Sequence, residues 1–298
     1  MFKRSLKTLS VAGVLTTLSL GPGFADEVSD DTAPAWRAVE PENLMIIELA
    51  RGNIVIELND DFAPGHVAQM QKLSADKAYD GHTFYRVIDG FVAQGGLDDD
   101  DVDEGYPLLA NENDRPISAA EFTPLGNADL FTETVGHIDG FPVGRSEALG
   151  REWLLHCPGA IAMARDNDPD SGGTDFYIVL DAQRYLDRNL TVFGRVISGM
   201  QHVQAVKRGV REIESGVIQP PEQGDEFLSI RVASDLPEDV RPQWEVMETT
   251  SAEFDAFKTS KRVRNEPFFY RHPPEVLDVC SFATPAREVT KEETSASE

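Results

Sequence analysis

Short apolar runs separated by turn residues occupy the middle of the sequence, and they limit the fold more than any other feature. The runs are four to seven residues long and rich in Val, Ile, Phe and Tyr, and half of them are followed directly by Gly, Asp or Asn. This length and composition are typical of β-strands. We therefore predict strands over residues 44–49, 54–58, 83–88, 91–94, 159–164, 176–180, 191–196 and 227–233.

Two segments in the same region have a helical pattern instead. Pro64 lies at an early helical position after two acids, and Val67, Met70 and Leu73 continue with a spacing of three to four residues. The second segment is shorter and covers 200–206. Many short strands with two short helices predict a mainly antiparallel β-barrel.

Residues 1–25 have the pattern of a secretory signal peptide. Lys3, Arg4 and Lys7 form a basic start, residues 9–20 are apolar, and small residues precede a cleavage point after Ala25. The apolar stretch is too short to cross a membrane. We therefore expect a mature protein that is periplasmic or secreted.

The charge balance excludes several classes of partner. The chain has 27 Lys and Arg against 52 Asp and Glu, for a formal net charge of -25. Nucleic acids and anionic lipids are both bound through basic surfaces. We expect no nucleic-acid partner, and no membrane partner once the signal peptide is removed.

Histidine and cysteine positions give no sign of a metal site. The six His and two Cys lack the spacing of zinc ligands. The acids at 98–101 do not continue into an EF-hand, since Gly and Glu are missing where that loop needs them, so we expect a solvated acidic loop. Cys157 and Cys280 can form one disulfide in an oxidising compartment, with two buried free thiols as the alternative.

Three regions lie outside the predicted barrel domain of residues 43–236 or interrupt it. Residues 26–42 form an acidic lead-in, and 124–156 are Gly- and Asp-rich and are expected to be a long loop insertion. In the C-terminal extension, 237–298, Thr250 and Glu253 form a capping-box pattern before a short helix. We expect its apolar residues at 268–270 and 276–277 to dock on the barrel, and a disordered end from residue 285.

The candidate chemistry lies in three segments: 84–96 (FYRVIDGFVAQGG), 159–178 and 185–196. They contain one strand arginine, Arg86, beside apolar and aromatic residues. They contain no Ser/His/Asp set, no Cys/His pair and no phosphate-binding loop. A lone strand arginine is most often a salt-bridge partner, so the residues by themselves do not establish catalysis.

In order and spacing, these segments resemble the cyclophilin-type peptidyl-prolyl cis/trans isomerases. The family pattern Phe-His-Arg-Val-Ile-x-Gly-Phe-x-x-Gln-Gly-Gly is matched except at Tyr85. Three further family motifs follow along the chain. They are a Gly-x-x-x-Met-Ala strand, a segment similar to Gly-Ser-Gln-Phe-Phe, and a segment similar to Trp-Leu-Asp with a later Val-Phe-Gly. The resemblance covers about 43–234. It implies an eight-stranded antiparallel barrel closed by two helices, proline-containing polypeptide substrates, and no cofactor.

The resemblance also implies roles for individual residues. Arg86 corresponds to the catalytic arginine, and Gln94 to the glutamine that holds this arginine and the substrate backbone. Ala164 and Arg165 lie where the family pairs with the peptide through main-chain groups. The proline pocket would be lined by Phe91, Val92, Tyr177 and Leu186.

Several of these positions depart from the family pattern. Arg165 and Asp166 replace Asn and Ala, which makes the peptide groove more charged. The other replacements are Val92 for Met, Tyr177 for Phe, Tyr185 for Trp and Leu190 for His.

Two hypotheses follow. Retained Arg86, Phe91 and Gln94 favour an isomerase that assists the folding of exported proteins. The changes at Val92, Asp166 and Leu190 favour a non-catalytic, cyclophilin-like peptide-binding or chaperone module.

Overall fold

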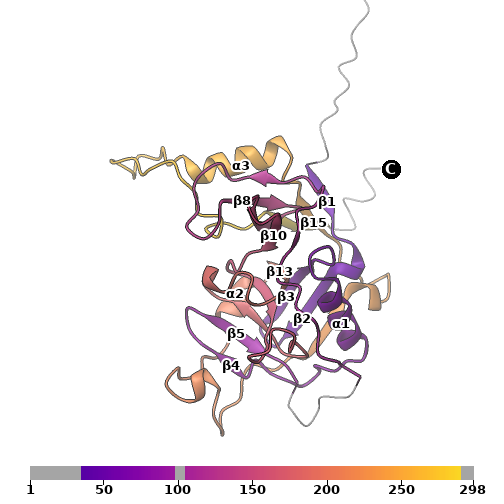
Figure 1. The fold of residues 1–298 in the computed structure, drawn as a ribbon. Coiled ribbons are helices and arrows are strands. Elements are labelled where there is room, and N and C mark those ends of the chain that lie inside the picture. Colours follow the sequence, from indigo (N-terminus) through magenta and orange to yellow (C-terminus); the bar gives the residue numbers. More distant parts are fainter. Residues whose placement is uncertain (1–34, 98–104, 290–298) are drawn as a thin grey trace, which may run out of the picture. The chain divides into compact units, whose positions relative to one another are not determined.

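The computed structural model describes residues 35–97 and 105–289 (Figure 1). The predicted signal peptide, the start of the acidic lead-in, the acidic run at 98–101 and the last residues of the tail lie outside this part of the chain. No helix in the described ranges is long and apolar enough to cross a membrane. Nor do these residues include a group of three or more His, Cys, Asp or Glu side chains that could hold a metal ion.

The predicted antiparallel β fold is confirmed by an eight-stranded sheet. Beyond its two edge strands, the backbone N–H of Phe84 donates to Asp225 O (3.0 Å) and that of Phe227 to His82 O (2.8 Å). These bonds join the two ends of a curled sheet. Its order is β14 (Ser229–Val232), β2 (Leu44–Leu49), β3 (Gly52–Leu58), β13 (Val192–Ser198), β11 (Ala160–Met163), β12 (Phe176–Val179), β5 (Val92–Gly95) and β4 (Arg86–Val87).

Both helices expected in this domain are present. Helix α1 (Pro64–Ala75) begins at Pro64, and the carboxylate of Glu112 accepts hydrogen bonds from two N–H groups of its first turn. Helix α2 (Met200–Gln204) is shorter. The connecting 3-10 turns are η1 (Pro41–Asn43), η3 (Arg184–Leu186), η4 (Glu214–Gly216) and η5 (Ala233–Asp235).

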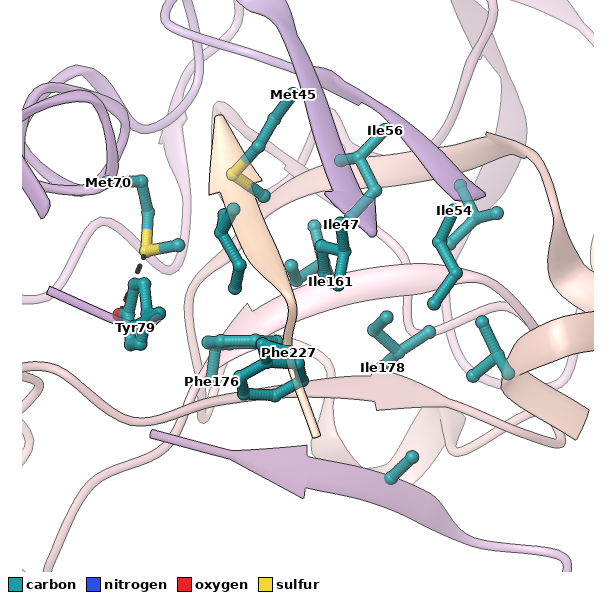
Figure 2. Close-up of a cluster of buried hydrophobic side chains, with 14 of the residues drawn as sticks. Met45, Ile47, Ile54, Ile56, Met70, Tyr79, Ile161, Phe176, Ile178 and Phe227 are labelled. Carbon is teal, nitrogen blue, oxygen red and sulfur yellow. Dashed lines mark hydrogen bonds between the residues drawn. The ribbon is translucent and has the colours of Figure 1, made fainter. Parts of the chain in front are cut away.

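The barrel core contains side chains from the inner face of the sheet and from both helices. Val67, Met70 and Leu73 of α1 and Val203 of α2 are buried in it. Figure 2 shows strand side chains such as Ile161 and Ile178 beside aromatic rings such as Phe176. Because strand residues alternate between faces, their neighbours in sequence point away from this core.

The prediction of a long loop at 124–156 is wrong, because three strands within this insertion belong to a second antiparallel sheet. Glycines hid the strand pattern: a Cβ on Gly144 would lie 2.7 Å from the Trp153 indole nitrogen, so the missing side chain makes room for that ring. The sheet order is β6 (Arg115–Pro116), β10 (Arg151–Leu154), β9 (Phe141–Ser146), β8 (Thr134–Ile138) and β7 (Thr123–Pro124).

The lead-in and the C-terminal extension share a third sheet. Its central strand is β15 (Trp244–Met247), which pairs with β1 (Trp36–Ala38) on one side and with β16 (Ala286–Glu288) on the other. The disordered end predicted from residue 285 is therefore wrong over β16, where backbone pairing with β15 orders the chain.

Helix α3 (Ala252–Arg262) is the short helix expected in the extension. Its cap lies one residue later than the capping-box pattern indicated. The hydroxyl of Ser251, not that of Thr250, accepts the hydrogen bond from the backbone N–H of Phe254 (3.1 Å).

A disulfide joins Cys157, just before β11, to Cys280 in the extension. Around it, Leu277 and Val279 pack with Trp153 and other side chains of the insertion. The expected docking of 268–270 is wrong, since Phe268 is 85% and Tyr270 87% exposed. Prolines on both sides of that segment remove backbone donors, which disfavours its pairing with a strand.

Candidate active site

The register of the sheet places the predicted site residues on its outer face. Arg86 of β4 lies opposite Gln94 of β5, and Gln94 lies opposite Tyr177 of β12. Residues directly opposite in an antiparallel pair project to the same side, so these three side chains share one face. Val92 is two residues from Gln94 and projects to that side as well.

The guanidinium of Arg86 is fixed at two of its nitrogens. Nη1 donates to Oε1 of Gln94 (2.8 Å) and Nε donates to the carbonyl oxygen of Ser215 (2.9 Å). Among the described residues, Nη2 takes part in no hydrogen bond and can donate to a ligand. The guanidinium carbon lies 5.8 Å from the centroid of the Phe91 ring.

A chain of hydrogen bonds sets the orientation of the Gln94 amide. Its Nε2 donates to the hydroxyl of Tyr85 (2.5 Å), and that hydroxyl donates to Oδ2 of Asp175 (2.6 Å). Burial, and then the charge of Asp175, raises the pKa of Tyr85, so the phenol stays protonated. With Nε2 held in this way, Oε1 is turned toward Arg86.

Reasoning from the sequence did not find this role for Tyr85 and Asp175. The available signal was that both residues depart from the family pattern, Tyr85 replacing His and Asp175 replacing Gln. The structure places the two replacements in direct contact.

The residues expected to line a proline pocket belong largely to one apolar cluster on the outer face. Val92 (2% exposed) and Tyr177 (4%) are buried in it, and Phe91 and Ala164 are partly buried against it. Phe122, two residues before the insertion, packs against the same cluster. Leu186, also expected in the pocket, is half-buried on the turn η3 and does not belong to this cluster.

The polar groove expected beside this pocket is present. Gln94, Ala164 and Arg165 line a hollow of about 400 Å³ together with Tyr85 and Asp175. The N–H of Ala164 already donates to Asp175 O (2.8 Å), so only its carbonyl is open to a peptide. Arg165 reaches across to the carbonyl oxygen of Asn189 (2.8 and 3.0 Å).

Tyr177 has a second set of polar partners that the sequence did not predict. Its hydroxyl lies 2.9 Å from Nε2 of His156, which is fully buried. Nδ1 of the same imidazole lies 3.1 Å from the carboxylate of Asp187. A proton on Nδ1 satisfies Asp187 and leaves Nε2 to accept from Tyr177.

Comparison with known proteins agrees with this arrangement. The family model described as "Cyclophilin type peptidyl-prolyl cis-trans isomerase/CLD" matches residues 44–229. The chain belongs to the cyclophilin family of peptidyl-prolyl isomerases. It is therefore an isomerase of peptidyl-prolyl bonds.

Individual relatives fit the same assignment. The chain is 34% identical over 186 residues to a "Probable peptidyl-prolyl cis-trans isomerase" of Brucella suis biovar 1, covering 62% of this chain and 82% of that protein. It is 35% identical over 162 residues to "Peptidyl-prolyl cis-trans isomerase B" of Bacillus subtilis, covering 54% and 88%.

One solved structure resembles more of the chain. The cyclophilin AquaCyp293 from Hirschia baltica matches with a TM-score of 0.71 and 31% identity, over 86% of this chain and 94% of that one. The likeness therefore extends beyond residues 44–229 of the family match.

Proposed function

We propose that Arg86 catalyses prolyl isomerisation by stabilising a twisted peptide bond electrostatically. Resonance keeps the peptide bond planar, with a rotation barrier of about 18–20 kcal/mol. At an Xaa-Pro bond both isomers are populated, and exchange takes roughly tens to hundreds of seconds. The catalyst needs no nucleophile or base. It has to bind the twisted amide better than either planar form.

The observation that carries this proposal is the two-point attachment of Arg86 beside an unbonded Nη2. When the amide twists, the prolyl nitrogen localises its lone pair and becomes a better hydrogen-bond acceptor. A donor already held in place needs no rearrangement to meet it, and the apolar surroundings strengthen the bond. Lowering the barrier by about 5–8 kcal/mol corresponds to roughly 10⁴- to 10⁶-fold acceleration.

The same face supplies the remaining contacts. The proline ring would rest on the cluster that contains Phe91, Val92 and Tyr177, with Leu186 at its side. The residues before the proline would occupy the groove formed by Gln94, Ala164 and Arg165. This path brings the Xaa-Pro bond next to the guanidinium.

We also propose that the protein acts on exported polypeptides. The support is the signal-peptide pattern in residues 1–25 and the disulfide, which suits an oxidising compartment. The amino-terminal residue of the protein recovered from the periplasm or the medium tests this part. Asp26 is expected, and an intact Met1 in the cytoplasm would contradict it.

A cis/trans exchange assay on blocked Xaa-Pro tetrapeptides tests the activity of this chain itself. The protein from Asp26 onward is expected to shorten the exchange from minutes to seconds at catalytic concentrations. No acceleration for any residue before the proline would favour the non-catalytic peptide-binding module.

A further inference from the structure

A second groove lies where the insertion meets the turn η3. It has a volume of about 620 Å³. One wall contains Phe131, Leu149 and Trp153 of the insertion, and the other contains Tyr185 and Asn189 of the barrel domain. The mechanism above uses none of these residues.

Apolar side chains at this groove are exposed to solvent. Phe131 is 56%, Leu149 57% and Tyr185 61% exposed, and Leu130, which precedes Phe131, is 96% exposed. A gathering of large exposed apolar residues at a hollow is typical of an interaction site.

The two arginines at the groove are already paired with carboxylates, and the carboxylate of Glu133 accepts hydrogen bonds from the Ser146 hydroxyl and the backbone N–H of Glu147. Arg184 bonds to both Asp129 and Asp187. Arg188 bonds to Asp114. A small charged ligand would have to compete with these pairs, whereas an apolar polypeptide segment would not.

The groove is continuous with the candidate proline pocket. Leu190 packs against the apolar cluster of that pocket, and Asn189, the residue before it in the chain, lines the groove. Asp187 also lines the groove and binds His156, whose imidazole contacts the hydroxyl of the pocket residue Tyr177. A polypeptide leaving the pocket past Leu190 therefore meets the groove at Asn189.

The same polar residues hold the far wall in place. Arg184 bonds to Oδ2 of Asp187 on one side (2.6 Å) and to Asp129 of the insertion on the other (3.1 Å). Asp129 in turn accepts a hydrogen bond from the backbone N–H of Phe131 (2.8 Å). Both walls are thus fixed by one chain of buried or half-buried groups, and the hollow is preformed before a ligand binds.

We propose that this groove is an extended substrate site, which binds apolar residues of an unfolded polypeptide flanking the isomerised proline. The proposal rests on the proposed function, because the groove serves the substrate only if the neighbouring apolar cluster binds the proline. In this proposal the insertion contributes to the binding of long substrates. Short peptides end before the groove, whereas unfolded proteins reach it.

The test compares a long and a short substrate. The long one is an unfolded protein whose refolding is limited by a prolyl isomerisation, and the short one is a blocked Xaa-Pro tetrapeptide. In the double variant Phe131→Ser/Leu149→Ser, the ratio of kcat/KM for the long to the short substrate should fall at least about fivefold, through KM. Val240→Ser is the matched control, because Val240 is 62% exposed and lies outside both sites; its ratio should equal that of the wild type.

An unchanged ratio in the double variant would overturn the proposal, as would an equal loss on both substrates. Fluorescence anisotropy of a labelled, permanently unfolded polypeptide gives a readout without catalysis, and the double variant should bind it at least about fivefold more weakly. If the wild type bound this polypeptide but isomerised neither substrate, the proposed function would fail and the groove would stand. A change in the oligomeric state of the double variant would overturn the proposal in favour of a contact between two copies of the chain.

Discussion

Tyr85 and Asp175 replace two family residues and act together on a third. Through them the Gln94 amide has one orientation, with Oε1 toward Arg86. A glutamine amide left free could present either its oxygen or its nitrogen to the guanidinium, and only the oxygen can accept from it. Tyr85 is therefore a positioning residue for Arg86.

Tyr85→Phe removes the hydroxyl and keeps the ring. We expect the maximal isomerisation rate to fall about three- to tenfold, with a smaller change in KM, because the loss of one hydrogen bond misplaces Arg86 in the transition state. Exchange rates measured by NMR at saturating peptide separate the two constants. Tyr270→Phe is the control, since the Tyr270 side chain is 87% exposed and lines neither the pocket nor the groove of the candidate site. A pure KM effect would mean that Tyr85 only binds substrate.

Val92 tests the shape of the proline pocket. It is buried where the family has methionine, and a longer, flexible side chain would cover more of a proline ring. We expect Val92→Met to keep or raise kcat/KM, at a cost of about 1–3 kcal/mol in the free energy of unfolding because the larger side chain enters a buried position. A large loss of activity in a folded variant would show that Val92 does not face the proline.

At the scale of elements, the barrel could be predicted because its strands alternate and its turns carry Gly, Asp and Asn. The hairpin of β2 and β3 and the start of α1 follow these local rules directly. The second sheet could not be predicted, because its strands contain glycines that make room for side chains of the neighbouring strand, as Gly144 does for Trp153, and these glycines interrupt the apolar alternation. The third sheet pairs strands more than 200 residues apart, Trp36 with Met247, and no local pattern encodes that pairing.

The candidate site also has a part that could be predicted from the sequence and a part that could not. Arg86 and Gln94 were found because the motif carries them. The contacts of Tyr85 with Asp175 and of Tyr177 with His156 cross between separate segments of the chain, so they required the fold.

The contact between β8 and α3 contains a buried histidine that predicts a pH dependence. His137 is fully buried against the Phe254 ring, and neither ring nitrogen has a hydrogen-bond partner among the described residues. Burial, and then the charges of Arg195 and Lys258, lower the pKa of His137 to about 3. In the unfolded chain His137 takes up a proton near pH 6.5, whereas in the folded protein it does so only near pH 3. The contribution of neutral His137 to the free energy of unfolding is therefore complete above pH 6.5 and is lost as the pH falls toward 3.

Urea unfolding at pH 7 and pH 5 measures this loss. The wild type should lose roughly 2 kcal/mol more than His137→Leu between the two pH values, since each unit below 6.5 costs about 1.4 kcal/mol. Parallel losses in both proteins would show that His137 is protonated or exposed in the folded state.

At the scale of the whole molecule, the extension is tied to the barrel domain covalently and by burial. Cys157 and Cys280 are 123 residues apart, and the strands of the third sheet come from both ends of the described chain. A buried ion pair, Arg195 with Glu57 (2.8 Å), adds a polar tie, since Arg195 also donates to the carbonyl oxygen of Thr284. The extension is therefore part of the folded body and not an appendage.

Cys280→Ser measures the covalent tie. In the chain-entropy model, a disulfide closing a loop of this length stabilises the folded state by about 4–5 kcal/mol. We expect the variant to unfold at a correspondingly lower urea concentration, and the wild type to match it only when reduced. Thiol titration of the unfolded, non-reduced wild type should find no free thiol; two per chain would refute the disulfide.

The proposed mechanism requires that Arg86 acts on the twisted amide and not on substrate binding. NMR exchange spectroscopy on an Xaa-Pro peptide, titrated against wild type and Arg86→Ala, measures the catalysed rate and the peptide Kd in one experiment. We predict a loss of rate of at least roughly tenfold with nearly unchanged Kd, and poor rescue by Arg86→Lys because lysine lacks the planar fork. Equal losses in rate and affinity, or full activity in Arg86→Ala, would contradict the claim.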